Sequence, residues 1–133
     1  MPPRKRRIPV VFDTNVIVGY YLSRSPASPN QQAFRLWRDQ RDLQLIVSDE
    51  ILAEYFEVLS RLGVPDFLLK KLAERFAQRK TVTSVRIGAI PRMSRDPDDN
   101  LMIATARSGK AKFLVTNDDD LLAIPVHEQA DCV

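Results

Sequence analysis

The chain has 133 residues, of which 44% are hydrophobic and 28% charged, and this composition is typical of one soluble α/β or α+β domain. A single cysteine, Cys132, excludes an internal disulfide, and a single histidine, His127, excludes metal sites built from several imidazoles. Without those ligands, any metal ion would have to be bound through oxygen atoms.

The N-terminal segment does not resemble a signal peptide. Its basic residues 4–7 precede an apolar run of only five residues, 8–12, which ends at Asp13 and is too short for the hydrophobic region of a signal. No segment approaches the roughly 20 apolar residues of a membrane-spanning helix. We therefore expect a basic, flexible N-terminus over residues 1–7, a single domain over residues 8–133, no membrane association and a cytoplasmic location.

Charge is unevenly distributed along the chain. Residues 1–80 carry 14 basic and 9 acidic side chains, whereas residues 81–133 carry 6 basic and 8 acidic ones. Two acidic clusters stand out, one at Asp96, Asp98 and Asp99 and the other at residues 118–120. Such clusters in a mildly basic protein suit a cation-binding centre approached by a polyanion, although a solvated acidic turn would explain either cluster alone.

The hydrophobic pattern alternates short strands with helices. Residues 8–12 are an apolar, branched run that predicts a buried strand ending in a turn at Asp13, Thr14 and Asn15. We expect, in order, a helix over 28–41, a strand over 45–47, a helix from 48 or 49 to 62 that Gly63 ends, a helix over 65–80, a strand over 81–86, a helix over 97–108 and a strand over 112–116, followed by an acidic loop at 117–120.

This order of elements predicts an α/β fold. Strands separated by helices require right-handed crossovers, which give a mostly parallel sheet with helices on both faces. In such sheets, binding sites lie beyond the carboxyl ends of the strands. Asp13 follows the first expected strand and Asp118 follows the last. If those strands are neighbours, the two acidic segments meet at one edge of the sheet.

The helix expected over 48–62 carries one acidic residue in a suggestive place. Glu54 lies at the edge of the apolar stripe beside Val58, whereas Glu50 and Glu57 lie further round toward solvent. Glu57 also stands four residues before Arg61, which makes an ordinary helix-surface ion pair available to it. Glu54 alone would be read as a surface residue, and it becomes a site candidate only in the company of other acids.

Two interpretations stay open for residues 95–100, which read Arg-Asp-Pro-Asp-Asp-Asn. Asp96, before a proline, is a good N-cap, and Asp99 in the first turn would stabilise the helix dipole. Alternatively, these carboxylates bind a metal ion, because Asp96, Asp99, Asn100 and Ile103 share one face of the expected helix. For Asp99, the two roles are compatible.

The acidic loop at 118–120 places three like charges side by side. At about 4 Å and an effective dielectric constant near 20, each like pair costs around 4 kcal/mol. Splayed, solvated side chains would avoid that cost, and so would a bound cation. Together with Asp13, Glu54 and Asp99, the loop favours a metal site.

Four segments, taken together, resemble the PIN-domain ribonucleases. They are Val-Val-Phe-Asp-Thr-Asn at 10–15, the helix with Glu54, Asp-Pro-Asp-Asp-Asn at 96–100, and residues 113–122 with Asp118 and Asp120. The Asp-Pro-Asp-Asp start of the acidic helix is similar to VapC-like toxins of toxin–antitoxin systems, and the resemblance covers about residues 8–125. The chain departs from the family at Asn117, where relatives often have glycine, and at 125–133, which lacks the usual pattern of a closing strand.

The resemblance implies a PIN-like three-layer sandwich with a mostly parallel five-stranded sheet. It implies Mg²⁺ or Mn²⁺ as cofactor, RNA as substrate and a cognate antitoxin protein as partner, and it leaves a homodimer open. By position, it implies Asp13, Glu54, Asp99 and Asp118 as catalytic and metal-binding acids, Asp96 and Asp120 as supplementary acids, and Asn15, Thr116 and Asn100 as polar supports. The choice between Asp96 and Asp99, and between Asp118 and Asp120, as direct ligands stays open.

The expected activity is metal-dependent hydrolysis of RNA phosphodiester bonds, which is chemistry that Mg²⁺ or Mn²⁺ on carboxylates supports. The alternative is a catalytically weak PIN-fold module that binds RNA or another protein. An aspartyl-phosphate enzyme or switch is disfavoured, because only one acid follows the first strand and Asn15 stands where a phosphatase needs a second Asp. Candidates for contacts with the RNA backbone are Arg24, Arg35, Arg38, Arg41 and Arg95.

Overall fold

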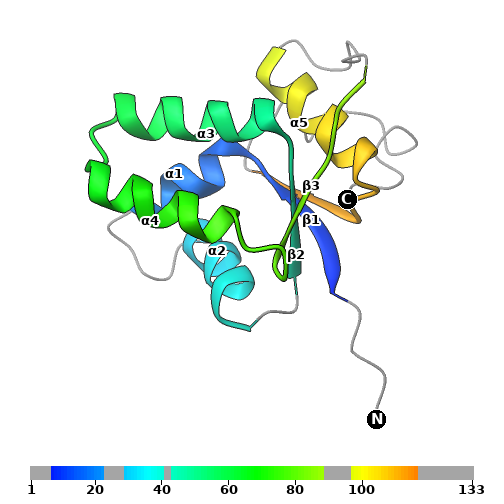
Figure 1. Cartoon of the computed structure of the whole chain (residues 1–133), viewed down its shortest axis with the longest axis horizontal. Helices are drawn as coiled ribbons and strands as arrows, with labels where there is room; N and C mark the ends of the chain where they lie inside the picture. Colours follow the sequence, from blue (N-terminus) through cyan, green and yellow to red (C-terminus); the bar gives the residue numbers. More distant parts are fainter. Residues whose placement is uncertain (1–6, 23–28, 41–42, 89–96, 117–133) are drawn as a thin grey trace.

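The computed structural model describes residues 7–22, 29–40, 43–88 and 97–116 (Figure 1). Strands and helices alternate in the order that the sequence predicts, with one helix added after the first strand. The elements are β1 (Ile8–Phe12), α1 (Thr14–Leu22), α2 (Pro29–Gln40), β2 (Leu43–Val47), α3 (Asp49–Arg61), α4 (Asp66–Phe76), β3 (Val82–Ser84), α5 (Pro97–Ser108) and β4 (Phe113–Val115).

The strands form a parallel sheet in the order β3-β2-β1-β4. Val10 in the middle of β1 pairs with Leu45 of β2 on one side and with Phe113 of β4 on the other. The first and last strands are therefore neighbours. Under this condition, the sequence analysis expects Asp13 to lie near the end of β4. Four strands lie in the described ranges. The fifth strand that the resemblance implies is not among the described residues, and residues 1–6 of the basic terminus expected over 1–7 lie outside them.

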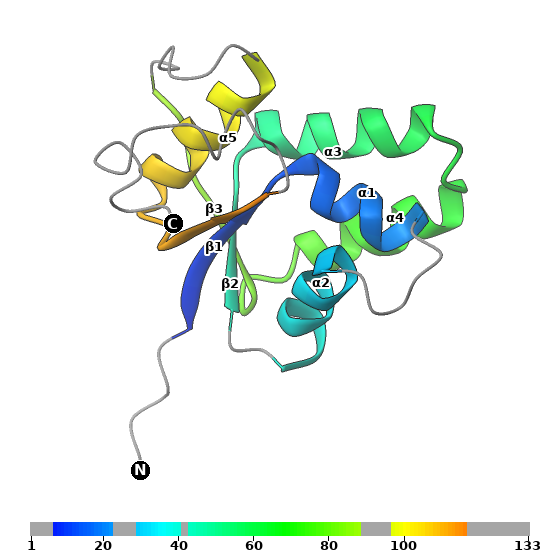
Figure 2. The same ribbon diagram turned by 180° about the vertical axis from the view of Figure 1, so that it is seen from behind.

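Helices cover both faces of the sheet, as predicted. In Figures 1 and 2, α1, α2, α3 and α4 lie on one side of the strands and α5 lies on the other. Strands covered on both faces have no solvent side, which explains why Val10, Val11 and Phe12 are all buried. No helix in the described ranges is long and apolar enough to cross a membrane.

Local sequence signals explain where α3 and α5 begin and end. Ser48 caps α3, and its hydroxyl accepts a hydrogen bond from the backbone N–H of Ile51 at 3.2 Å. After α3, Gly63 takes a φ of 91°, the left-handed conformation that a glycine adopts easily at a helix end. Helix α5 spans residues 97–108 as predicted and starts at Pro97, whose fixed φ suits a first helical position.

Helix α1 corrects the sequence analysis, which predicts only a turn at Asp13, Thr14 and Asn15. The segment 14–22 is apolar almost all round, so it lacks the polar face by which helical periodicity is recognised. Its β-branched residues and central Gly19 also lower its intrinsic helix propensity. Burial against α2 and α3 overrides both, and Val16 and Ile17 are fully buried.

Three other boundaries differ from the prediction. Helix α4 ends at Phe76 and not at residue 80, because the carbonyl of Gln78 accepts the N–H groups of Thr81 and Val82 and turns the chain into β3. Strand β3 covers 82–84 only, and β2 begins at Leu43, two residues earlier than expected. The carboxyl end of β3 thus moves from residue 86 to Ser84, whereas β1 and β2 end at Phe12 and Val47 as predicted.

The approach of α5 to the sheet depends on Gly109. A Cβ atom added there would lie 2.3 Å from Cγ2 of Ile46 in β2, far inside van der Waals contact. Ile46 is β-branched and therefore stiff at χ1, so it cannot easily give way. We expect Gly109→Ala to lower the free energy of unfolding by about 1–3 kcal/mol.

The matched control is Gly88→Ala, where an added Cβ meets no atom within 4 Å. We expect this change to leave the free energy of unfolding unaltered or to raise it by up to about 1 kcal/mol. Urea denaturation of both variants measures the difference. Equal effects would contradict the close packing of α5 on β2.

Candidate active site

Asp13 lies at the carboxyl end of β1, directly before α1, and is only 5% exposed. Its backbone N–H donates to the carbonyl of Val115 in β4 at 2.9 Å. Its carboxylate oxygen Oδ2 accepts a hydrogen bond from the hydroxyl of Thr116, the residue after β4, at 2.7 Å. Backbone and side chain thus tie Asp13 to the end of the neighbouring strand.

Tyr55 fixes helix α3 over the same end of the sheet. Its ring is fully buried, and its hydroxyl donates to the carbonyl of Phe12, the residue before Asp13. Burial raises the pKa of Tyr55 well above its usual value, and the negative charge of Asp13 raises it further. The hydroxyl therefore stays protonated at neutral pH and remains a donor.

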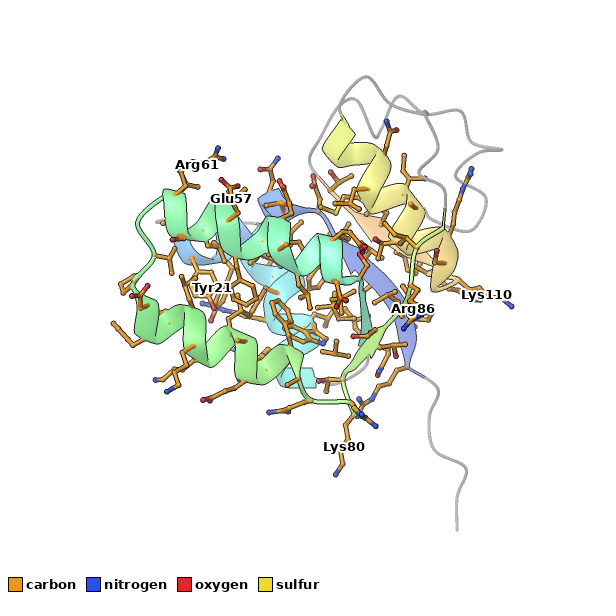
Figure 3. The ribbon with its side chains drawn as sticks, turned by 45° about the horizontal axis from the view of Figure 1, so that its top comes forward. Tyr21, Glu57, Arg61, Lys80, Arg86 and Lys110 are labelled. Atoms are coloured by element: carbon orange, nitrogen blue, oxygen red, sulfur yellow. The ribbon has the colours of Figure 1, made fainter. Side chains whose placement is uncertain are left out.

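The acids of α3 occupy two different environments, as the sequence predicts. Glu54, next to Tyr55 in the chain, is half-buried. Glu57 is exposed on the outer face of α3 and pairs with Arg61 at 3.9 Å (Figure 3). An exposed pair at this spacing has an ordinary helix-surface role. Glu54 is therefore the least exposed of the acids on α3.

Helix α5 is tied to the start of α3 by two buried hydroxyl groups. The Oγ atom of Ser48 lies 2.9 Å from Oγ1 of Thr105, and Thr105 also donates to the carbonyl of Leu101 at 3.0 Å. On the same helix, the side chain of Asn100 is buried, and Asp99 precedes it in the first turn. The Ser48–Thr105 contact thus sets the spacing between the two helices that carry Glu54 and Asp99.

The described residues contain only part of the predicted acidic site. Asp96, Asp118 and Asp120 lie outside these residues, and Asp99 is placed by its backbone alone. Asn15 is exposed in the first turn of α1. Within residues 7–22, 29–40, 43–88 and 97–116, no three Asp, Glu, His or Cys side chains converge as a metal site. Asp13 and Thr116 are the predicted site residues that the structure brings into contact.

Sequence reasoning missed the hydroxyl groups that support the site. Residue spacing along the helix expected over 48–62 does not reveal that the hydroxyls of Tyr55 and Ser48 reach Phe12 and Thr105. Sequence reasoning also gave no role to Thr14, which is 8% exposed and whose Oγ1 has no hydrogen-bond partner within the described residues. The contacts of Tyr55 and Ser48 join residues that are far apart in the chain, so only the three-dimensional structure reveals them.

The residues present suit a hard divalent cation. Oxygen is the donor atom throughout, and a buried carboxylate held by a neighbouring hydroxyl is the usual way in which proteins orient an acidic ligand. Thr14, next to Asp13 in the chain, contributes a buried hydroxyl that still requires a partner, which an ordered water molecule would satisfy. The carboxylate of Asp13 could therefore hold Mg²⁺ or Mn²⁺.

The two hydroxyls beside Asp13 should differ in their contribution to stability. Thr116→Val removes the hydroxyl that donates to Oδ2 of the buried carboxylate, and we expect the free energy of unfolding in EDTA to fall by about 1.5–3 kcal/mol. Thr14→Val removes a hydroxyl without a partner in the described part of the chain, and we expect no fall. Urea denaturation at pH 7 compares them, and equal losses would contradict the Asp13–Thr116 contact.

Comparison with known protein families matches residues 9–120 to the PIN domain. Neither the curated proteins nor the solved structures compared with the chain include a significant match. PIN domains are in general nucleases that use divalent metal ions. The match begins within β1, passes through Asp13 and Thr116 and extends beyond β4. The chain therefore belongs to the PIN domain family.

Proposed function

We propose that the protein is a metal-dependent endoribonuclease that hydrolyses RNA phosphodiester bonds. The observation that carries this proposal is the buried carboxylate of Asp13, held by Thr116 at the carboxyl end of the sheet in a PIN domain. Asp13, Glu54, Asp99 and Asp118 form the acidic site in this proposal. Asp96 and Asp120 supplement it.

Each of the described site residues has a separate task in the proposed reaction. Asp13 binds Mg²⁺ or Mn²⁺, and Thr116 fixes the direction of its carboxylate. Glu54 orients the attacking water or contributes to a second cation site. The bound ion would supply Lewis-acid activation of the phosphodiester and of the attacking water. Tyr55 and Ser48 hold the supporting backbone in place.

We further propose that the protein is the toxin of a type II toxin–antitoxin pair, with a small antitoxin protein as its partner. The Asp-Pro-Asp-Asp sequence at 96–99, which leads into α5, supports this assignment through its similarity to VapC-like toxins. A homodimer is compatible with the same assignment. A short reading frame for an antitoxin immediately upstream of the gene would support the pairing, and a gene that stands alone would favour a solitary ribonuclease.

The activity predicts a strict dependence on metal. Purified protein should cleave single-stranded RNA in Mg²⁺ or Mn²⁺, EDTA should abolish cleavage, and Asp13→Asn should reduce the rate by about 100-fold or more. The measurement is the initial rate of cleavage of a labelled RNA. Cleavage that persists in EDTA would rule out the metal mechanism.

Helix α3 provides a matched control for the role of Glu54. Glu54→Gln and Glu57→Gln remove the same charge from the same helix, but Glu57 is exposed and paired with Arg61. Only Glu54→Gln should slow cleavage strongly. RNA binding without cleavage by the unmodified protein in either metal would instead favour the catalytically weak binding module.

A further inference from the structure

A pocket of about 170 Å³ lies between α1, α2 and α4, away from Asp13. Tyr20 and Tyr21 at the end of α1 form part of its wall, and they lie seven and eight residues after Asp13. At 1.5 Å of rise per helical residue, this spacing separates them from Asp13 by roughly 10–12 Å along the helix. Figure 3 shows Tyr21 among these helices, on the side of the molecule away from α5. The pocket is therefore distinct from the candidate active site.

Aromatic side chains give this pocket a rigid wall. The rings of Tyr20 and Phe34 stack with centroids 4.0 Å apart and an angle of 17° between their planes. The ring of Tyr21 meets that of Tyr20 edge-on at 5.1 Å. Phe34 is buried against Trp37, whose ring it meets at 5.4 Å. The wall is thus anchored in the core of the protein.

Three cationic side chains line the same pocket: Arg38, Lys71 and Arg75. Arg38 is partly neutralised, since its guanidinium hydrogen-bonds Asp39 at 2.8 Å and also donates to the hydroxyl of Tyr20. Lys71 and Arg75 lie four residues apart on one face of α4, and neither forms an ion pair or hydrogen bond within the described residues. The pocket wall contains no acidic residue of the described ranges.

The charges of these cations extend into the pocket. Burial raises the pKa of the Tyr21 hydroxyl and the adjacent Tyr20 adds to that rise, whereas the positive charges of Arg75 and Arg38 oppose it. Arg75 also lowers the pKa of the exposed Asp39, though less than the hydrogen bond from Arg38 does. Arg75 thus acts electrostatically on Tyr21 in the pocket wall and on Asp39, which does not line the pocket.

The size of the pocket limits its occupant. A volume of about 170 Å³ corresponds to five or six water molecules at about 30 Å³ each, and it is smaller than the roughly 300 Å³ of pockets for whole small-molecule ligands. A phosphate group with part of one nucleotide fits this volume. Aromatic side chains beside cations, as in the wall of this pocket, are also the combination by which proteins bind single-stranded nucleic acid.

We propose that the pocket between α1, α2 and α4 binds a phosphate group and part of one nucleotide of the RNA chain, away from the bond that is cleaved. Lys71 and Arg75 contact the phosphate, and the ring of Tyr21 stacks on the base of the nucleotide. The proposal rests on RNA being the substrate. It extends the sequence-based expectation that Arg38 lies near the RNA, and Arg38 holds Tyr20 in the pocket wall.

The test measures RNA binding by fluorescence anisotropy, with the full chain and a labelled mixed-sequence single strand, in EDTA so that cleavage does not interfere. Lys71→Ala is compared with Lys70→Ala, a neighbouring exposed lysine of α4 that does not line the pocket. We expect Lys71→Ala and Arg75→Ala each to weaken binding and to reduce the dependence of log affinity on log salt concentration by about 0.7. Lys70→Ala should leave that dependence unchanged.

The aromatic contact has a separate readout. Tyr21→Leu should weaken RNA binding by about 5-fold or more without changing the salt dependence, because stacking involves no counterion release. Tyr21→Phe keeps the ring and should restore binding. Circular dichroism melts confirm that each variant is folded.

The outcomes separate this proposal from the proposed function. Equal affinities of Lys71→Ala, Arg75→Ala and Lys70→Ala for RNA would overturn the nucleotide subsite, even if the unmodified protein cleaves RNA in Mg²⁺. If Lys71→Ala and Arg75→Ala bind an acidic peptide more weakly but bind RNA as well as the unmodified protein does, the pocket serves a protein partner and the nucleotide subsite is overturned. Selective loss of RNA binding would support the subsite even if the protein proves catalytically inactive.

Discussion

The buried carboxylate of Asp13 constrains the whole carboxyl end of the sheet, because a charge removed from water must be held by donors or by a cation. One donor that the structure provides is the hydroxyl of Thr116, 103 residues away in the chain. That contact can form only where β1 and β4 are neighbours in parallel register. The topology of the fold and the chemistry of the site therefore depend on the same strand pair.

Two further contacts fix the helices around this strand pair. Tyr55 reaches the carbonyl of Phe12 and places α3 beside Asp13, while Thr105 meets Ser48 and places α5 beside the start of α3. Both are buried hydrogen bonds, which are costly to break because each leaves a polar group without a partner. Glu54 and Asp99 are thus carried by helices whose spacing is set from inside the core.

The sequence predicts these features wherever the determining signal is local. Pro97 and the acidic turn after it locate α5, Ser48 locates the start of α3, and the spacing of Glu57 and Arg61 predicts their ion pair. Helix α1 is missed because a segment that is buried nearly all round has no polar face to reveal its period. The hydrogen bonds of Tyr55 and Thr105 are missed because hydrophobic spacing identifies buried side chains but not the partners of their hydroxyl groups.

The central claim is that Asp13 anchors a divalent cation at the carboxyl end of β1, and the broadening of backbone amide NMR signals by Mn²⁺ tests it most directly. Substoichiometric Mn²⁺ should first weaken the signals of Asp13, Glu54 and Thr116, and leave those of α4 unchanged. The same titration of Asp13→Asn should show no such selectivity. Broadening that is centred elsewhere on the chain, or that persists unchanged in Asp13→Asn, would contradict the account.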